Sequence, residues 1–283
     1  MNDYIELTKP RVTWLILVST GVGFWYGAPG AWSWLVLLHT LIGTGLIAAG
    51  TFTLNQWMER DADARMNRTR MRPIPTGRVL PWQALVFGIA LSVVGSAELY
   101  LGANPLTALL GLFTEATYLG LYTPLKQKSW HSTTVGSIPG AMPPLIGFAA
   151  SAGTLTLEAW VLYAILFLWQ FPHFYAIAWM YRDDYARAGI RMLPVVEPDG
   201  ASTARLILLA SLILMPVSLL PSFLMMAGWI YFFGMVLAGA FFLYACFGVF
   251  LQRTSLQARS VLLASVIYLP VLYGLLIIDR AAI

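Results

Sequence analysis

Apolar side chains form nine long runs along the 283-residue chain, and short polar connections separate them. Each run approaches the roughly 20 residues that a helix needs to cross a hydrocarbon core of about 30 Å. We therefore predict an all-α, polytopic membrane protein with about nine transmembrane helices. The predicted spans are residues 11–31, 33–57, 81–102, 105–125, 133–153, 157–181, 204–225, 227–251 and 258–278.

The composition supports a membrane protein that consists of one domain over residues 1–283. Apolar residues make up 59% of the chain and charged residues only 11%, against roughly 25% charged in a soluble domain. No segment remains for a separate soluble domain. The single cysteine, Cys246, excludes an intramolecular disulfide and a cysteine-rich metal site, so we expect it to have a packing role.

The basic residues predict an orientation. With a cytoplasmic N-terminus and an external C-terminus, every Lys and Arg except Arg280 lies on the cytoplasmic side, as the positive-inside rule requires. This distribution accounts for the formal charge of +4 without nucleic acid binding. The first span has no cleavage site and no transit peptide is evident, so we expect a bacterial inner membrane.

Two loops on the cytoplasmic side are the places where we expect the chemistry. They cover about residues 58–80 and 182–203, and each holds a charged cluster followed by a proline. A separate feature is the Gly- and Pro-rich segment 135–147 within the fifth span, which predicts a kinked or broken helix. Either a watered cavity or close packing of small residues accommodates such a break.

The first loop begins with a regular spacing of oxygen ligands. Asn55, Glu59 and Asp63 recur every four residues and form one stripe on a helix, with Asp61 turned away from it. Carboxylates with open positions for phosphate oxygens are the usual way to hold Mg²⁺ beside a diphosphate. Five arginines follow between residues 65 and 78 and suit the remaining negative charge.

The competing interpretation of this stretch is a solvated loop whose arginines only follow the positive-inside rule. Carboxylates at the end of a membrane helix serve no topological purpose. The acidic stripe therefore favours a metal and diphosphate site.

The second cluster holds a histidine within an apolar helix. His173 and Asp184 are eleven residues apart and share one helix face if the helix continues through Pro172 and beyond Tyr181. An ionisable group at this depth faces a cavity or a partner, and a hydrogen-bonded core histidine is the structural alternative.

Two further ionisable groups in the spans are acidic. Glu98 lies near the external end of its span and reaches water, whereas Glu115 is deeper and has no partner that the sequence identifies.

A third element is the Tyr122 and Lys126 pair, which share a helix face unless Pro124 distorts the helix. The ammonium suits a phosphate, and the tyrosine ring suits a carbocation. A tyrosine and a lysine near a membrane interface are also common without any catalytic role.

These motifs resemble the UbiA-type intramembrane prenyltransferases, and among them the protoheme IX farnesyltransferases, or heme O synthases. The Asn followed at four-residue intervals by two acids matches the family, although Glu59 replaces the commoner Asp. The pairs Arg68-Thr69 and Arg72-Pro73, and Thr-Gly-Arg at 76–78, also match, as do Tyr122 and Lys126. The heme branch is indicated by Trp-Gln-x-Pro-His-Phe and Asp-Tyr-x-x-Ala-Gly-Ile-x-Met-Leu-Pro within 168–196, and by residues 140–147.

The resemblance implies helices around a central cavity that opens to the cytoplasmic leaflet, with farnesyl diphosphate and heme B as substrates. The family's second motif has two acids four residues apart, whereas Asp183 and Asp184 are adjacent here, and we favour Asp184 as the ligand. The implied Mg²⁺ ligands are Asn55, Glu59, Asp63 and Asp184, and the implied catalytic residues are these four with Tyr122. The implied substrate-binding residues are Arg68, Arg72, Lys126, Arg182, Asp61, His173 and Asp183, with His39 and His131 as weaker candidates for a heme contact.

Two other functions stay open at this point. A related enzyme that prenylates a quinone precursor or another lipid-soluble aromatic needs the acidic stripe but no histidine for heme. A transporter would use the broken fifth helix and Glu115 to line a path, but it would not need Mg²⁺. The expected partners are the lipid bilayer and a downstream heme A synthase or cytochrome oxidase assembly protein.

Overall fold

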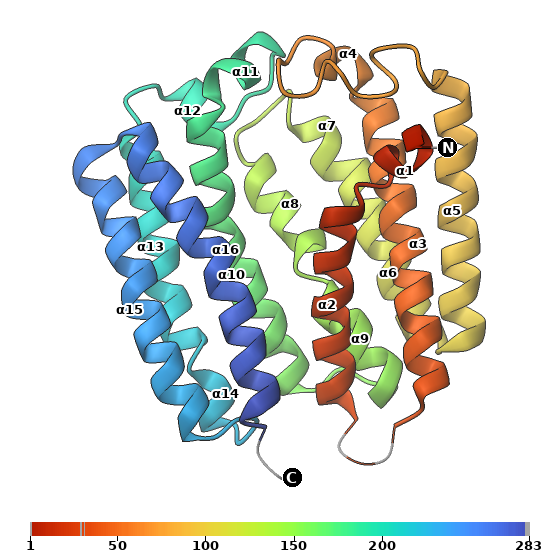
Figure 1. Ribbon diagram of the computed structural model, residues 1–283, viewed down its shortest axis with the longest axis vertical. Coiled ribbons are helices and arrows are strands. Elements are labelled where there is room, and N and C mark those ends of the chain that lie inside the picture. The colour runs from red at the N-terminus through yellow and green to blue at the C-terminus, as the bar shows by residue number, and fades with distance from the viewer. Residues whose placement is uncertain (1, 29, 31, 281–283) are drawn as a thin grey trace.

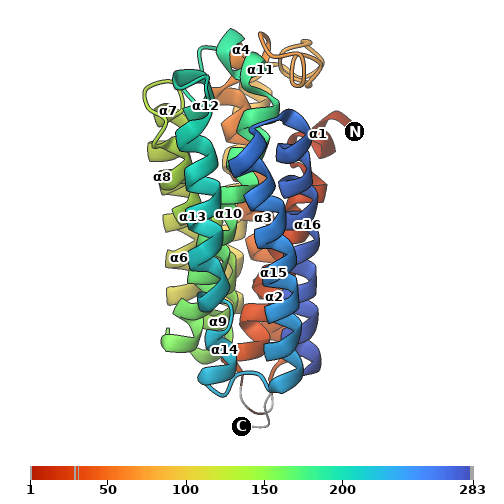
Figure 2. The same cartoon turned by 90° about the vertical axis from the view of Figure 1, so that its left-hand side faces the viewer.

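The computed structural model describes residues 2–28, 30 and 32–280, and within these ranges it contains helices and loops but no strand. Residues 29 and 31, at the end of the first predicted span, lie outside the described residues. The long helices run side by side along the long axis of the molecule (Figures 1 and 2). The elements are α1 (Asn2–Leu7), α2 (Pro10–Gly27), α3 (Trp34–Met58), α4 (Arg60–Asp63), α5 (Pro81–Gly102), α6 (Pro105–Thr117), the π-helical η1 (Tyr118–Tyr122), α7 (Thr123–Leu125), α8 (Ser132–Gly140), α9 (Pro143–Ala152), α10 (Leu157–Met180), α11 (Arg182–Arg187), α12 (Leu193–Val196), α13 (Ala201–Val217), α14 (Leu220–Phe223), α15 (Trp229–Gln252) and α16 (Ser255–Ile278).

Six helical segments among the described residues are long and apolar enough to cross a membrane: α3, α5, α10, α13 with α14, α15 and α16. The other three predicted spans are also helical, but α2, with 18 residues, is not apolar enough over its whole length, and the other two are interrupted. One interruption is η1 between α6 and α7, and the other is the break between α8 and α9. The prediction of an all-α, multi-pass membrane protein is confirmed.

Large apolar side chains cover the outside of the bundle. Leu101 is 81% exposed, Tyr244 80% and Ile278 76%. A water-soluble protein rarely exposes a continuous apolar surface of this kind, whereas lipid tails solvate it well.

The predicted break in the fifth span lies between Gly140, the last residue of α8, and Pro143, the first of α9. Non-helical backbone at membrane depth needs partners from neighbouring helices. Gln170 of α10 supplies one, because its Nε2 donates to the carbonyl of Ser137 at 3.0 Å. The break is therefore buried in protein.

Glycines let α2 and α9 cross with their backbones in contact. A Cβ atom on Gly23 would lie 2.0 Å from the carbonyl oxygen of Pro144, and one on Gly147 would lie 1.8 Å from that of Thr20. Small residues at such crossings permit close van der Waals packing between membrane helices. This crossing joins the first span to the broken fifth span.

The two charged loops meet at one end of the bundle. α4 and α11 lie together at the upper end in Figure 1, and the N-terminus lies at the same end. The expectation that both loops are on one side of the protein is confirmed.

We predict that Gly23→Ala destabilises the protein and that Gly21→Ala does not. Both positions are in α2, but nothing lies within 4 Å of a Cβ on Gly21. Alanine normally favours a helix over glycine by about 1 kcal/mol, whereas overpacking costs about 1–3 kcal/mol. Thermal unfolding in detergent should show a lower melting temperature for Gly23→Ala only. Equal melting temperatures for the two variants would contradict the close crossing.

Candidate active site

The predicted stripe of Asn55, Glu59 and Asp63 keeps its register, although the helix is not continuous. α3 ends at Met58, and Glu59, at φ −94° and ψ 8°, joins it to α4. The i to i−4 backbone hydrogen bonds nevertheless continue: Glu59 N donates to Asn55 O at 2.9 Å, and Asp63 N donates to Glu59 O at 2.8 Å. All three side chains can therefore act on one site.

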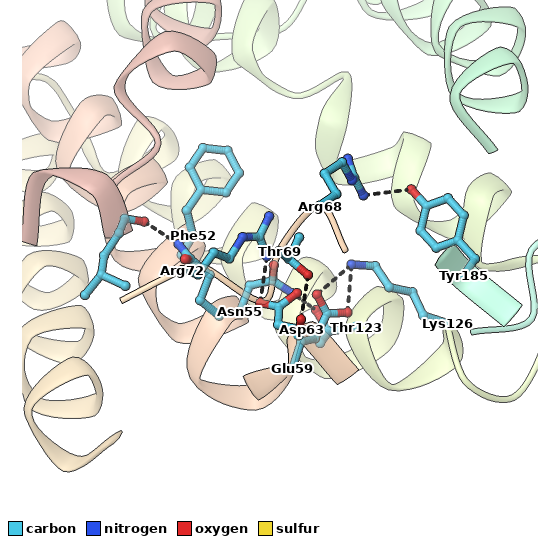
Figure 3. Close-up of polar contacts among 12 residues, drawn as sticks. Phe52, Asn55, Glu59, Asp63, Arg68, Thr69, Arg72, Thr123, Lys126 and Tyr185 are labelled. Atoms are coloured by element: carbon cyan, nitrogen blue, oxygen red, sulfur yellow. Dashed lines mark hydrogen bonds and ion pairs between the residues drawn. The ribbon is translucent and has the colours of Figure 1, made fainter. Parts of the chain in front are cut away.

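A cation pairs with each acid of the stripe. Lys126 Nζ lies 2.8 Å from Glu59 Oε1, with both side chains 12% exposed. Arg72 Nη1 lies 2.7 Å from Oδ2 of Asp63, whose side chain is 1% exposed. Figure 3 shows Arg72 and Lys126 approaching the acids from different sides. Loss of one partner of such a buried pair costs about 3–5 kcal/mol, so these pairs hold the site together.

The protonation state of Lys126 depends on this pairing. Burial alone would lower the pKa of Lys126, but the Glu59 carboxylate outweighs burial and raises the pKa well above its ordinary value. Lys126 is therefore a permanent cation in the site.

Tyr122 and Lys126 lie together, as their spacing predicts. Lys126 Nζ is 4.4 Å from the centre of the Tyr122 ring. Pro124 lacks the N–H that an α-helix would use there, and the preceding turn is the wider η1 helix. The distortion leaves the pair in contact.

Lys9 also belongs to this cluster, and sequence reasoning used it only for orientation. It precedes α2 with φ 48°, and its Nζ lies 5.0 Å from the centre of the Phe52 ring. Burial, followed by the nearby charges of Arg72 and Lys126, lowers the pKa of Lys9 to about 7. The signal in the sequence is a lysine immediately before the proline that begins α2.

Three basic side chains thus surround two carboxylates. The charges that act on Lys9 are Arg72, Lys126, Glu59 and Asp63, and with a pKa of about 7 Lys9 carries only part of a positive charge at neutral pH. An anion with several oxygens would complete the cluster, because charge-assisted hydrogen bonds to phosphate are strong.

The same residues leave free oxygens that suit a hard metal ion. Oδ1 of Asp63 is buried and has no hydrogen-bond partner. Asn55 uses its Nδ2 to donate to Thr123 Oγ1 at 3.2 Å, which leaves its Oδ1 available. In the described part of the chain no three His, Cys, Asp or Glu side chains form a metal-binding group. Mg²⁺ needs only one or two carboxylates when phosphate oxygens supply the rest, so the residues fit Mg²⁺.

Asp184 connects the second loop to the first. Its two carboxylate oxygens accept the backbone N–H groups of Asn67 and Arg68, each at 3.2 Å, and Oδ1 also accepts from Arg187. Burial would raise the pKa of Asp184, but these donors outweigh burial and lower it. The Asp184 side chain is 9% exposed and that of Asp183 is 88% exposed, so only Asp184 faces the protein.

The condition for His173 and Asp184 to share one helix face, a helix that continues beyond Tyr181, is not met. α10 does continue through Pro172, but it ends at Met180, and Tyr181 has φ −113° and ψ 22° before α11 begins. The break turns Asp184 towards the first loop.

The other predicted substrate-binding residues lie at the edge of the cluster. Arg68 packs over the Tyr181 ring at 5.0 Å and donates from Nη2 to the Tyr185 hydroxyl at 3.2 Å. Asp61 is turned away from the acids, as expected, and lines a surface cleft of about 340 Å³. Arg182 packs over Trp179 and lies 3.8 Å from Asp183.

The remaining ionisable groups of the spans have local partners. His39 pairs with Glu98 at 2.7 Å, and His131 stacks on Trp130 at 3.8 Å between ring centres. Glu115, for which the sequence identified no partner, accepts from Ser92 at 2.5 Å. His173 Nδ1 lies 2.8 Å from Ser265 Oγ of α16.

Comparison with known proteins identifies the family. The sequence pattern of the UbiA prenyltransferase family matches residues 16–268. The chain belongs to the UbiA prenyltransferase family. The protoheme IX farnesyltransferase of Solibacter usitatus (strain Ellin6076) is 60% identical over 289 residues, which cover 99% of each chain.

Solved structures show that this member has the UbiA fold. A structure described as giving insights into digeranylgeranylglyceryl phosphate synthase has a TM-score of 0.80 at 16% identity, covering 98% of this chain and 97% of the other. A UbiA homolog from Archaeoglobus fulgidus bound to GPP and Mg²⁺ has a TM-score of 0.67 at 18% identity, with 97% and 99% covered.

We predict that Asp184→Ala releases the first loop of this UbiA family member, whereas Asp183→Ala does not. Each hydrogen bond to a charged group contributes about 1.5–3 kcal/mol, so loss of the carboxylate should increase loop opening about tenfold or more. Trypsin cleavage after Arg68 and Arg70 in detergent measures this opening. The same cleavage rate in both variants would contradict the connection between the loops.

Proposed function

We propose that the protein transfers a farnesyl group from farnesyl diphosphate to a vinyl group of heme B, with addition of water, to give heme O. The observation that carries the reaction type is the cluster of Glu59 and Asp63 with Lys9, Arg72 and Lys126, which suits a metal-bound diphosphate. The choice of heme as the acceptor rests on the relative that is 60% identical across 99% of both chains.

The diphosphate would bind where the cations converge. Lys126 and Arg72 would exchange part of their contact with the acids for phosphate oxygens, and Arg68 would reach the same group from the first loop. Tyr122 lies beside Lys126, and its ring would stabilise the positive charge that develops on the allylic carbon.

Asn55, Glu59, Asp63 and Asp184 are the residues that we assign to Mg²⁺. The buried, unpartnered Oδ1 of Asp63 supports this assignment most directly. When bound, Mg²⁺ polarises the diphosphate as a leaving group. Asp184 has a second role, because its hydrogen bonds position the backbone of Arg68.

The reaction has a simple balance. The bond from the allylic carbon to the diphosphate oxygen breaks, and a vinyl carbon of heme B forms the new bond. Water captures the resulting cation and releases a proton. The apolar helices would hold the farnesyl chain and exclude water from the allylic carbon until the new bond forms.

The architecture that we propose has nine membrane crossings around a central cavity that opens towards the two loops. Six long apolar helices, the three further helical stretches α2, α6 to α7 and α8 to α9, and the UbiA fold support this arrangement. We place the protein in a bacterial inner membrane with a cytoplasmic N-terminus, which puts the basic loops on the cytoplasmic side. A heme A synthase or an oxidase assembly protein would receive the product.

The two alternative functions are a transporter and an enzyme that prenylates a quinone precursor. Membership of a prenyltransferase family argues against a transporter. Prenylation of a quinone precursor would use the same acids and would differ from heme prenylation only in the acceptor. The experiment must therefore measure which acceptor is prenylated.

We expect the purified protein, incubated with heme B, farnesyl diphosphate and Mg²⁺, to give a heme adduct with the mass of farnesyl plus water. Asp63→Ala should lower the rate by about 100-fold or more, because metal catalysis contributes several kcal/mol. Glu158→Gln, an acid at the opposite end of α10, is the control and should keep the wild-type rate. Unmodified heme together with a prenylated aromatic acid would assign the enzyme to the quinone type.

Removal of divalent metal with EDTA should abolish turnover but leave the melting temperature nearly unchanged. Lys126 and Arg72 neutralise the carboxylates without a metal, so the fold does not need one. Added Mg²⁺ should restore the rate. Full activity in excess EDTA would contradict the assignment of Asn55, Glu59 and Asp63.

A further inference from the structure

The imidazole of His173 has a fixed orientation between α10 and α16. Its Nδ1 lies 2.8 Å from Ser265 Oγ, and its ring stacks on that of Trp169 with centres 4.6 Å apart. Trp169 in turn donates from Nε1 to the carbonyl of Ser265 at 2.9 Å. Ser265 therefore anchors both rings of this stack.

The hydrogen bonds of Ser265 also determine which ring nitrogen of His173 carries the proton. Ser265 Oγ donates to the carbonyl of Leu262 at 2.7 Å. A hydroxyl has a single proton, so towards His173 the same oxygen accepts. Nδ1 is thus the donor, and Nε2 of the neutral ring keeps its lone pair.

The lone pair of Nε2 has no hydrogen-bond donor among the described residues. Around the axis of α10, the side chain of His173 leaves the helix in a direction between those of Trp169 and Gln170. Trp169 contacts α16, and Gln170 contacts α8. The His173 side chain is partly exposed. Met180, the last residue of α10, lies seven positions after His173, which places His173 about 10 Å below the loop end of α10.

We propose that Nε2 of His173 ligates the iron of the heme acceptor, an assignment that rests on the proposed function. A histidine that binds a metal through one nitrogen usually donates the other N–H to an oxygen, as His173 does to Ser265. Neutral imidazole is a common ligand of heme iron. Trp169 and Phe174, whose ring centre is 5.4 Å from that of His173, supply apolar surface for the macrocycle.

The depth of His173 agrees with this role. The diphosphate binds at the loop end among Arg72 and Lys126, and the prenyl chain extends from there into the apolar interior. A heme held about 10 Å deeper meets the chain from below, so its vinyl edge and the allylic carbon can approach each other.

The test is a titration of heme B into the purified full-length protein in detergent, without farnesyl diphosphate. Optical and electron paramagnetic resonance spectra should show a histidine-ligated iron. His173→Ala should lose this spectrum, and an unchanged melting temperature in detergent shows that the variant is folded. Glu158→Gln, at the opposite end of α10, should keep the wild-type spectrum.

Ser265→Ala tests whether the hydrogen bond from Nδ1 to Ser265 positions the imidazole of His173 for the iron. Loss of the partner of Nδ1 should weaken heme binding about 10–100-fold and leave the ligand spectrum recognisable. Ser260→Ala, at an exposed position of the same helix, is the matched control.

Each result has a definite meaning. A histidine-ligated spectrum that persists in His173→Ala overturns the proposal, as does a wild-type spectrum without histidine ligation. Unchanged heme spectra in His173→Ala with loss of prenylation would make the imidazole a base for the attacking water instead. A histidine-ligated heme that the wild type does not prenylate would support the ligand and refute the proposed function.

Discussion

The buried ion pairs at the loop end of the bundle are the interaction on which the rest of the site depends. Glu59 with Lys126 and Asp63 with Arg72 place charge next to an apolar interior, where an unpaired charge is costly. Because each carboxylate has a cationic partner, the site is stable without bound substrate. Lys9, with a pKa of about 7, gains a full positive charge when an anion binds beside it, so an anionic substrate with its metal can bind by rearranging existing contacts.

The second requirement is a connection between the two halves of the chain. Asp184 supplies it by accepting the backbone N–H groups of Asn67 and Arg68 in the first loop. The backbone at Arg68 is therefore held from α11. Backbone donors fix the path of a loop more strictly than a flexible side chain does. The second acidic cluster therefore organises the first, and the adjacent Asp183 has no such role because it faces solvent.

The apolar bundle gives these polar groups fixed positions. Backbone contact at Gly23 and Gly147 joins α2 to α9, and the break in the fifth span is covered by Gln170 of α10. From the same helix, Trp169 and His173 reach Ser265 on α16. One helix thus carries the contacts to both of its neighbours at the depth where the prenyl chain and its acceptor would meet.

The sequence by itself determined what depends on local spacing. It predicted the helical spans, the shared side of the two loops, the break near residue 141, and the stripe of Asn55, Glu59 and Asp63, because hydropathy and four-residue periods act over a few turns. Only the tertiary structure decided which groups pair across the chain. Lys126 meets Glu59 over 67 positions and Asp184 meets Arg68 over 116. The turn at Tyr181, the place of Lys9 and the partner of Glu115 also depend on packing between distant helices, and a local pattern carries no information about that packing.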